Sequence, residues 1–175
     1  MMSTEGNRDR KELLHEKYSE DSPQISPDGN FIAYTSNESG KEDVFVRSFP
    51  DVDNGDIWSV SNDGGNSPLW SPNGDEIYYR NGDATMVVPV ETEPTFKPGT
   101  PEILFMKTYA YATLLNQITA TWWDIHPTNG KFLMLKPLEP TDDESTAGDI
   151  AEKAPSKIII VTNFFEELKE KVPVP

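Results

Sequence analysis

The sequence predicts an all-β protein built from a repeated antiparallel hairpin, and three observations lead to this fold class. The 175 residues include 15 prolines and 11 glycines, and few long stretches have helical apolar spacing, which favours many short strands and turns. Residues 25–34 read ISPDGNFIAY, which combines the residues of a tight turn with the unbroken apolar run of a buried strand. The pattern returns as WSPNGDEIYY at residues 70–79 and, more loosely, as IHPTNGKFLM at residues 125–134.

The spacing of the three copies indicates the size of the repeated unit. Gly29 and Gly74 are 45 residues apart, and Gly74 and Gly130 are 56 apart. A period of about 40–45 residues with four strands in each copy is typical of β-propeller blades. We attribute the longer second interval to an insertion at residues 106–120, a long connection that suits either a ligand or a dimer contact.

The first two units follow directly from the turn signals. Residues 11–16, which contain Leu13 and Leu14, fit either a short amphipathic helix or a lone outer strand, and periodicity does not decide. The first unit, residues 22–62, has predicted strands at 23–25, 31–36, 43–48 and 56–61. The second, residues 66–105, has predicted strands at 68–70, 76–80, 85–91 and 101–105.

The third unit, residues 121–162, lacks a fourth strand. Its predicted strands are 121–125, 131–136 and 157–162, and the acidic, proline-flanked stretch 137–156 between the last two predicts a solvated loop. In place of a fourth strand, Asn163 is placed to cap a short C-terminal helix at residues 164–171.

Three stretches resemble the TolB-type β-propeller repeat (a WD-repeat-like repeat with SPDG turns), in the form found at the C-terminal end of bacterial propeller proteins. They are SPQISPDGNFIAYTSNESGKEDVFVRSFP at residues 22–50, residues 63–105 with SPNGDEIYYR and VETEPTFKPGTPEILF, and NFFEELKEKVP at residues 163–173. The resemblance covers nearly all of residues 20–175 outside the acidic loop. It implies one half-propeller domain over residues 1–175 and a role in protein–protein interaction. HPTNG at residues 126–130 departs from SPDG by an extra residue.

Three blades are too few for an ordinary propeller, which has about four to eight. An outer strand at residues 11–16 would complement the missing strand of the third unit. We therefore expect a homodimer in which two chains pair head to tail into a six-bladed ring, each N-terminal strand completing the partner's third blade. Two alternatives stay open: the chain is a fragment of a longer propeller, or it is a self-contained three-bladed form.

Charge and composition exclude several partners. With 30 acidic and 15 basic residues the net charge is −15, so we expect no nucleic-acid or membrane partner, although solubility alone explains the acidity. The absence of cysteine excludes disulfides and thiolate zinc sites. The polar N-terminus shows no signal peptide, which predicts a cytoplasmic location, or a periplasmic or extracellular one if the chain is part of a longer precursor.

Metal and cofactor signals are weak, and we expect neither. Residues 51–56, DVDNGD, look like a calcium loop, but the glycine is one place early and the twelfth position is Asn62, so an acidic turn is the simpler interpretation. The chain has two histidines, His15 and His126, which is little material for a metal-dependent propeller enzyme. It has neither a Gly-x-Ser-x-Gly elbow nor a glycine-rich phosphate loop.

The candidate ligand-binding residues are those that the predicted innermost strands would place at a propeller channel: Trp70, Trp123, Asp124 and His126. The simpler interpretation is that Trp70 and Trp123 pack between blades and that His126 caps a hairpin in place of the turn serine. The sequence therefore predicts a non-enzymatic binding or scaffold module with a protein or peptide partner. The alternatives are a propeller-type lyase or lactonase, and the sensor fragment of a larger bacterial signalling protein.

Overall fold

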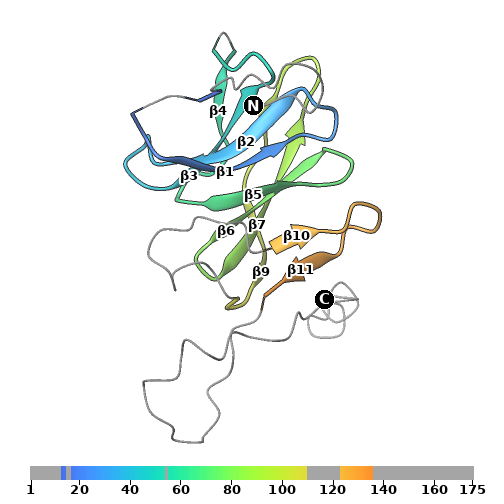
Figure 1. Cartoon of the computed structure of the whole chain (residues 1–175). Coiled ribbons are helices and arrows are strands. Elements are labelled where there is room, and N and C mark those ends of the chain that lie inside the picture. Colours follow the sequence, from blue (N-terminus) through green and yellow to red (C-terminus); the bar gives the residue numbers. More distant parts are fainter. Residues whose placement is uncertain (1–12, 15–16, 54, 110–122, 136–175) are drawn as a thin grey trace, which may run out of the picture. The chain divides into compact units, whose positions relative to one another are not determined.

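A computed structural model describes residues 13–14, 17–53, 55–109 and 123–135, and all regular structure in them is β. The chain divides into two compact units, Met1–Met106 and Lys107–Pro175. The described residues form eleven strands in antiparallel pairs (Figure 1). No helix in this part of the chain is long and apolar enough to cross a membrane.

The first sheet is a four-stranded antiparallel meander in the order β1-β2-β3-β4. Its strands are β1 (Glu20–Ile25), β2 (Phe31–Ser36), β3 (Asp43–Ser48) and β4 (Ile57–Ser59). The four predicted strands are thus confirmed as antiparallel neighbours. The first begins three residues earlier than predicted, and the fourth is shorter at both ends.

The second sheet repeats this order and adds a strand. It contains β5 (Asn66–Trp70), β6 (Glu76–Asn81), β7 (Ala84–Glu91), β8 (Lys97–Pro98) and β9 (Glu102–Met106). β9 pairs with the first half of β7, and β8 pairs with its last two residues. The sequence did not predict β8. It forms because β7 is eight residues long and extends past the end of β9.

The two sheets repeat each other down to the backbone conformation. The pairing of β1 with β2 shifts register between Asp21 and Gln24, and that of β5 with β6 shifts between Asn66 and Leu69, 45 residues later. Within these shifts Ser22 and Ser67 have φ angles of 51° and 53°. Positive φ is uncommon for a residue other than glycine, so its recurrence before a proline in both sheets marks a repeated structural device.

The described part of the second unit is one hairpin, β10 (Trp123–Ile125) and β11 (Phe132–Met134), with the same register as the other two. The pair Ile125 and Phe132 corresponds to Ile25 and Ile32 and to Trp70 and Ile77. Six residues separate the partners each time, so the apparent extra residue in HPTNG does not lengthen the turn. It moves the glycine instead.

Backbone hydrogen bonds show the effect of that move. Gly29 N donates to Ser26 O and Gly74 N donates to Ser71 O, each three residues back, whereas Gly130 N donates to His126 O, four residues back. All three glycines have positive φ, between 66° and 79°, a conformation that glycine adopts without a steric penalty.

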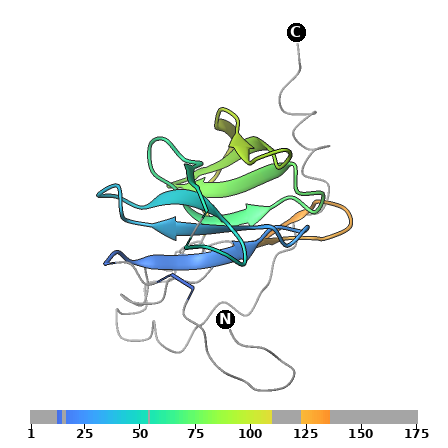
Figure 2. The same cartoon turned by 90° about the horizontal axis from the view of Figure 1, so that it is seen from above.

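The two sheets pack face to face (Figure 2). We call the face of the first sheet that carries Ile32 and Tyr34 its front face, and likewise the face of the second sheet that carries Ile77 and Tyr79. The opposite face of each sheet is its back face. Cross-strand partners point to the same side of a sheet, which assigns each residue to a face. The back face of the first sheet meets the front face of the second in one apolar cluster, formed by Phe31, Ala33, Val44, Val46, Val60, Trp70, Ile77, Tyr79, Val88, Val90 and Phe96.

The buried carboxylate of Asp43 fixes the connection between the sheets. It accepts hydrogen bonds from Ser39 Oγ at 2.6 Å, from Ser61 Oγ at 2.7 Å and from Gly64 N at 2.9 Å. A buried charge is tolerated when it is hydrogen-bonded in this way. Burial, together with the negative charge of Asp43, raises the pKa of Tyr79 to about 12.

Three predicted elements fall wholly or mainly outside the described residues: the strand at 157–162, the C-terminal helix at 164–171 and the N-terminal strand at 11–16. Of the last, Leu13 and Leu14 are described and lie in no strand.

Candidate functional site

Trp70, the first residue predicted at a channel, lies in the core between the two sheets. Its ring meets Phe96 edge-on at 6.2 Å between centroids, and its Nε1 donates a hydrogen bond to Gln24 O at 3.1 Å. The indole thus links β5 to β1 while its body is buried. This is the packing role that the sequence offered as the simpler interpretation.

Trp123 and Asp124 lie on opposite sides of β10, in the second unit. The Trp123 ring is buried and stacks on Phe132, with 5.6 Å between centroids and 17° between planes. Asp124 is exposed, and its Oδ1 accepts a hydrogen bond from Ile125 N. Trp70 belongs to the first unit, so the structure describes no single site that contains all the predicted residues.

His126 has the position that serine has in the other two hairpins. Its Nδ1 accepts a hydrogen bond from Thr128 N at 3.2 Å. In the other turns, Ser26 Oγ accepts from Phe31 N and Ser71 Oγ accepts from Glu76 N, each at 2.9 Å. The imidazole therefore caps its turn from within, as the simpler interpretation of His126 expects, although it bonds a different backbone amide.

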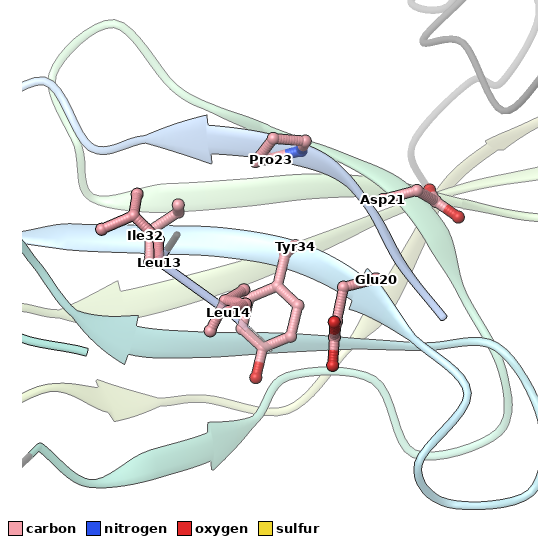
Figure 3. Close-up of a pocket in the computed structure, with 7 residues that line it drawn as sticks. All are labelled: Leu13, Leu14, Glu20, Asp21, Pro23, Ile32 and Tyr34. Carbon is pink, nitrogen blue, oxygen red and sulfur yellow. The ribbon is translucent and has the colours of Figure 1, made fainter. Parts of the chain in front are cut away.

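The sequence did not single out a cavity that lies on the front face of the first sheet. Its volume is about 220 Å³. In the view of Figure 3, Leu13 overlies Ile32 and Leu14 overlies Tyr34 of β2. The lining residues are Leu13, Leu14, Glu20, Asp21, Pro23, Ile32 and Tyr34.

The front face of the first sheet extends beyond this cavity. The register places Ile25 beside Ile32, Tyr34 beside Phe45, and Ile57 beside Arg47. At the edges of the face, Ile25 is 51% exposed and Ile57 is 47% exposed. The front face of the first sheet thus has a partly exposed isoleucine at each of two edges.

A buried cation supports the centre of this face. Arg47 Nε donates a hydrogen bond to Tyr34 Oη at 2.8 Å, and the guanidinium lies 5.8 Å from the centroid of the Tyr34 ring. Burial raises the pKa of Tyr34, although the bond from Arg47 opposes this, so the phenol stays neutral and able to accept at physiological pH.

Two aspartates of the first sheet have pKa values shifted in opposite directions. Burial raises the pKa of Asp21 and the nearby charge of Glu42 raises it further, while hydrogen bonds from Ser22 and Thr35 lower it. For Asp28 slight burial acts upward, but hydrogen bonds from Ser26 and Asn30 outweigh it and the pKa is lowered. Asp21 is therefore the cavity-lining carboxyl group whose ionisation the fold disfavours.

The sequence carries a signal for this face in the spacing of its apolar residues. Ile32 and Tyr34 are 45 residues before Ile77 and Tyr79, so all four are expected on front faces.

Among the described residues, no three His, Cys, Asp or Glu side chains gather as a metal site would require. Comparison with models of known protein families and with curated proteins finds no match for this chain.

Proposed function

We propose that this chain is a non-enzymatic binding or scaffold module of the TolB-type β-propeller kind, and that two copies complete one ring. The ring would present its surface to a protein or peptide partner. One observation carries the proposal: the front face of the first sheet repeats that of the second, yet Ile25 is 51% exposed where its counterpart Trp70 is buried against a neighbouring sheet.

The repeat itself indicates what fits this face. On the second sheet, the front face with Trp70, Ile77 and Tyr79 packs against the back face of the first sheet. The equivalent residues of the first sheet are Ile25, Ile32 and Tyr34. A back face of the same kind is therefore the complementary surface, and in the proposed ring the third unit of the other copy would supply it.

The number of units agrees with a two-fold ring. Three hairpins of one register lie in the described part of each chain, and two chains bring six, within the common range of about four to eight propeller blades. Cyclic dimers are the commonest oligomers, and their closure removes the exposed sheet faces that favour aggregation.

Light scattering coupled to size exclusion tests this proposal. At micromolar concentration we expect a mass of twice 19.6 kDa. The double variant Ile25→Asp/Ile57→Asp should shift it to the single-chain mass, because two charges would enter an apolar interface. Ile103→Asp is the matched control, since Ile103 is similarly exposed at 59% but lies on β9 of the second sheet.

The control variant should stay dimeric, and all variants should keep the circular dichroism of the parent, because every substituted side chain is exposed. A folded parent chain that remains at 19.6 kDa over the whole concentration range would contradict the two-chain ring.

A further inference from the structure

We infer that Leu13 and Leu14 form an intramolecular plug on the front face of the first sheet, and that a second copy must displace this plug to dock there. The inference rests on the proposed self-association. It adds the surface that is used and a competition that limits access to it.

The first argument is position. Leu13 and Leu14 line one cavity with Ile32 and Tyr34, so they lie over the centre of the front face (Figure 3). In the second sheet the equivalent residues, Ile77 and Tyr79, belong to the cluster shared with the first sheet. The leucine pair therefore takes the place that the repeat gives to the back face of another sheet, and both cannot occupy it.

The second argument is the quality of the fit. Under the leucine pair a cavity of about 220 Å³ remains, and Ile25 beside it is half exposed. Its equivalent Trp70 is buried against the neighbouring sheet. Side chains that line an open pocket of this size do not reach the close packing of a protein interior. A complete back face would provide this packing, so docking of a second copy can displace the plug.

The third argument is what the plug protects. Ile32 and Tyr34 are buried, at 4% and 1% exposed. Without a cover they would present an apolar surface to water in the free chain, which is unfavourable. A loosely fitted plug covers the surface in the single chain and still yields it to a better partner.

Chemical cross-linking tests the competition directly, because the chain contains no cysteine. In the variant Leu14→Cys/Ile32→Cys, a short bifunctional thiol reagent applied to the dilute chain should link the two thiols within one chain. The linked form should then remain at the single-chain mass at concentrations where the same variant, unlinked, is dimeric. A chain that fails to link, or a linked chain that still dimerises, would overturn the plug.

A second variant covers the case in which Ile32→Cys itself weakens the interface. Leu13→Ala/Leu14→Ala should lower the dissociation constant of the two-fold dimer by about a hundredfold if each plug is open in about a tenth of free chains, because the plugs of both copies must open. An unchanged or higher constant would count against the plug while leaving the ring intact. If the parent chain never dimerises, the proposed function fails instead.

Discussion

The front faces of the two sheets carry related residues but have different neighbours. That of the second sheet is covered by a complete sheet, and Ile77 in its centre is fully buried. That of the first sheet has Leu13 and Leu14 above it, a cavity beneath them and exposed isoleucines at its edges. The comparison teaches that two sheet faces with related residues differ in exposure because their neighbours differ.

The largest expected difference between the two faces is at Trp70 and Ile25, which occupy equivalent positions. Trp70→Ala should reduce the free energy of unfolding by about 3–5 kcal/mol, because it empties a buried site between the sheets. Ile25→Ala should change it by less than about 0.5 kcal/mol, since the side chain is half exposed. Urea unfolding below the concentration at which chains associate measures both. Equal losses would show that the two faces are covered alike.

A smaller difference is expected at the centres of the faces. Ile77→Ala should cost about 2–5 kcal/mol, in the upper part of that range, because its neighbours are two packed sheets that cannot close the void. Ile32→Ala should fall at the lower end, because the residue already borders a cavity and the leucine pair can settle toward it. The same unfolding measurement applies. A larger loss at Ile32 than at Ile77 would mean that the cover of the first sheet is the better packed one.

The smallest effect is the pH dependence that distinguishes Asp21 from its equivalent, Asn66. The folded state raises the pKa of Asp21, so it binds this proton more tightly than the unfolded chain does. The parent should therefore lose stability relative to Asp21→Asn as the pH rises from about 3 to 7. Unfolding free energies along this pH series give the difference.

Asp28→Asn provides a control of opposite sign. The pKa of Asp28 is lowered in the folded state, so here the parent should lose its advantage over the variant as the pH falls. If both variants show the same slope, the shifts do not arise from the local contacts of each carboxyl group.

The sequence predicted the strands whose signals are local. Pro27 and Gly29 form a tight turn, and the run from Phe31 to Tyr34 pairs on both sides, so this hairpin and its copy in the second sheet appear as expected. β8 was not predicted because Lys97 and Pro98 carry no strand signal. They pair with β7 only where that strand extends beyond its pairing with β9. The register shifts at Ser22 and Ser67 were also missed, since no residue preference announces a non-glycine residue at positive φ.

The candidate site was predicted less well than the fold. The predicted residues carry side chains suited to ligand binding. In the structure, however, the Trp70 indole packs in the core and the His126 imidazole caps a turn. The front face of the first sheet consists of ordinary apolar residues, which a search for chemical groups passes over. Only the comparison of equivalent positions, such as Tyr34 and Tyr79, shows that the surface has a counterpart with a known neighbour.

The buried Asp43 has a consequence for anyone who would rearrange this chain as modules. Its bonds to Ser61 Oγ and Gly64 N, and the bond from Gly65 N to Glu42 O, hold the segment after β4 to the first sheet. The boundary between the segment that forms the first sheet and the segment that forms the second therefore follows Gly65 rather than β4. A circular permutation or a duplication that cuts after Gly65 keeps the Asp43 carboxylate with its donors, whereas a cut directly after Ser59 would separate it from Ser61 Oγ and Gly64 N.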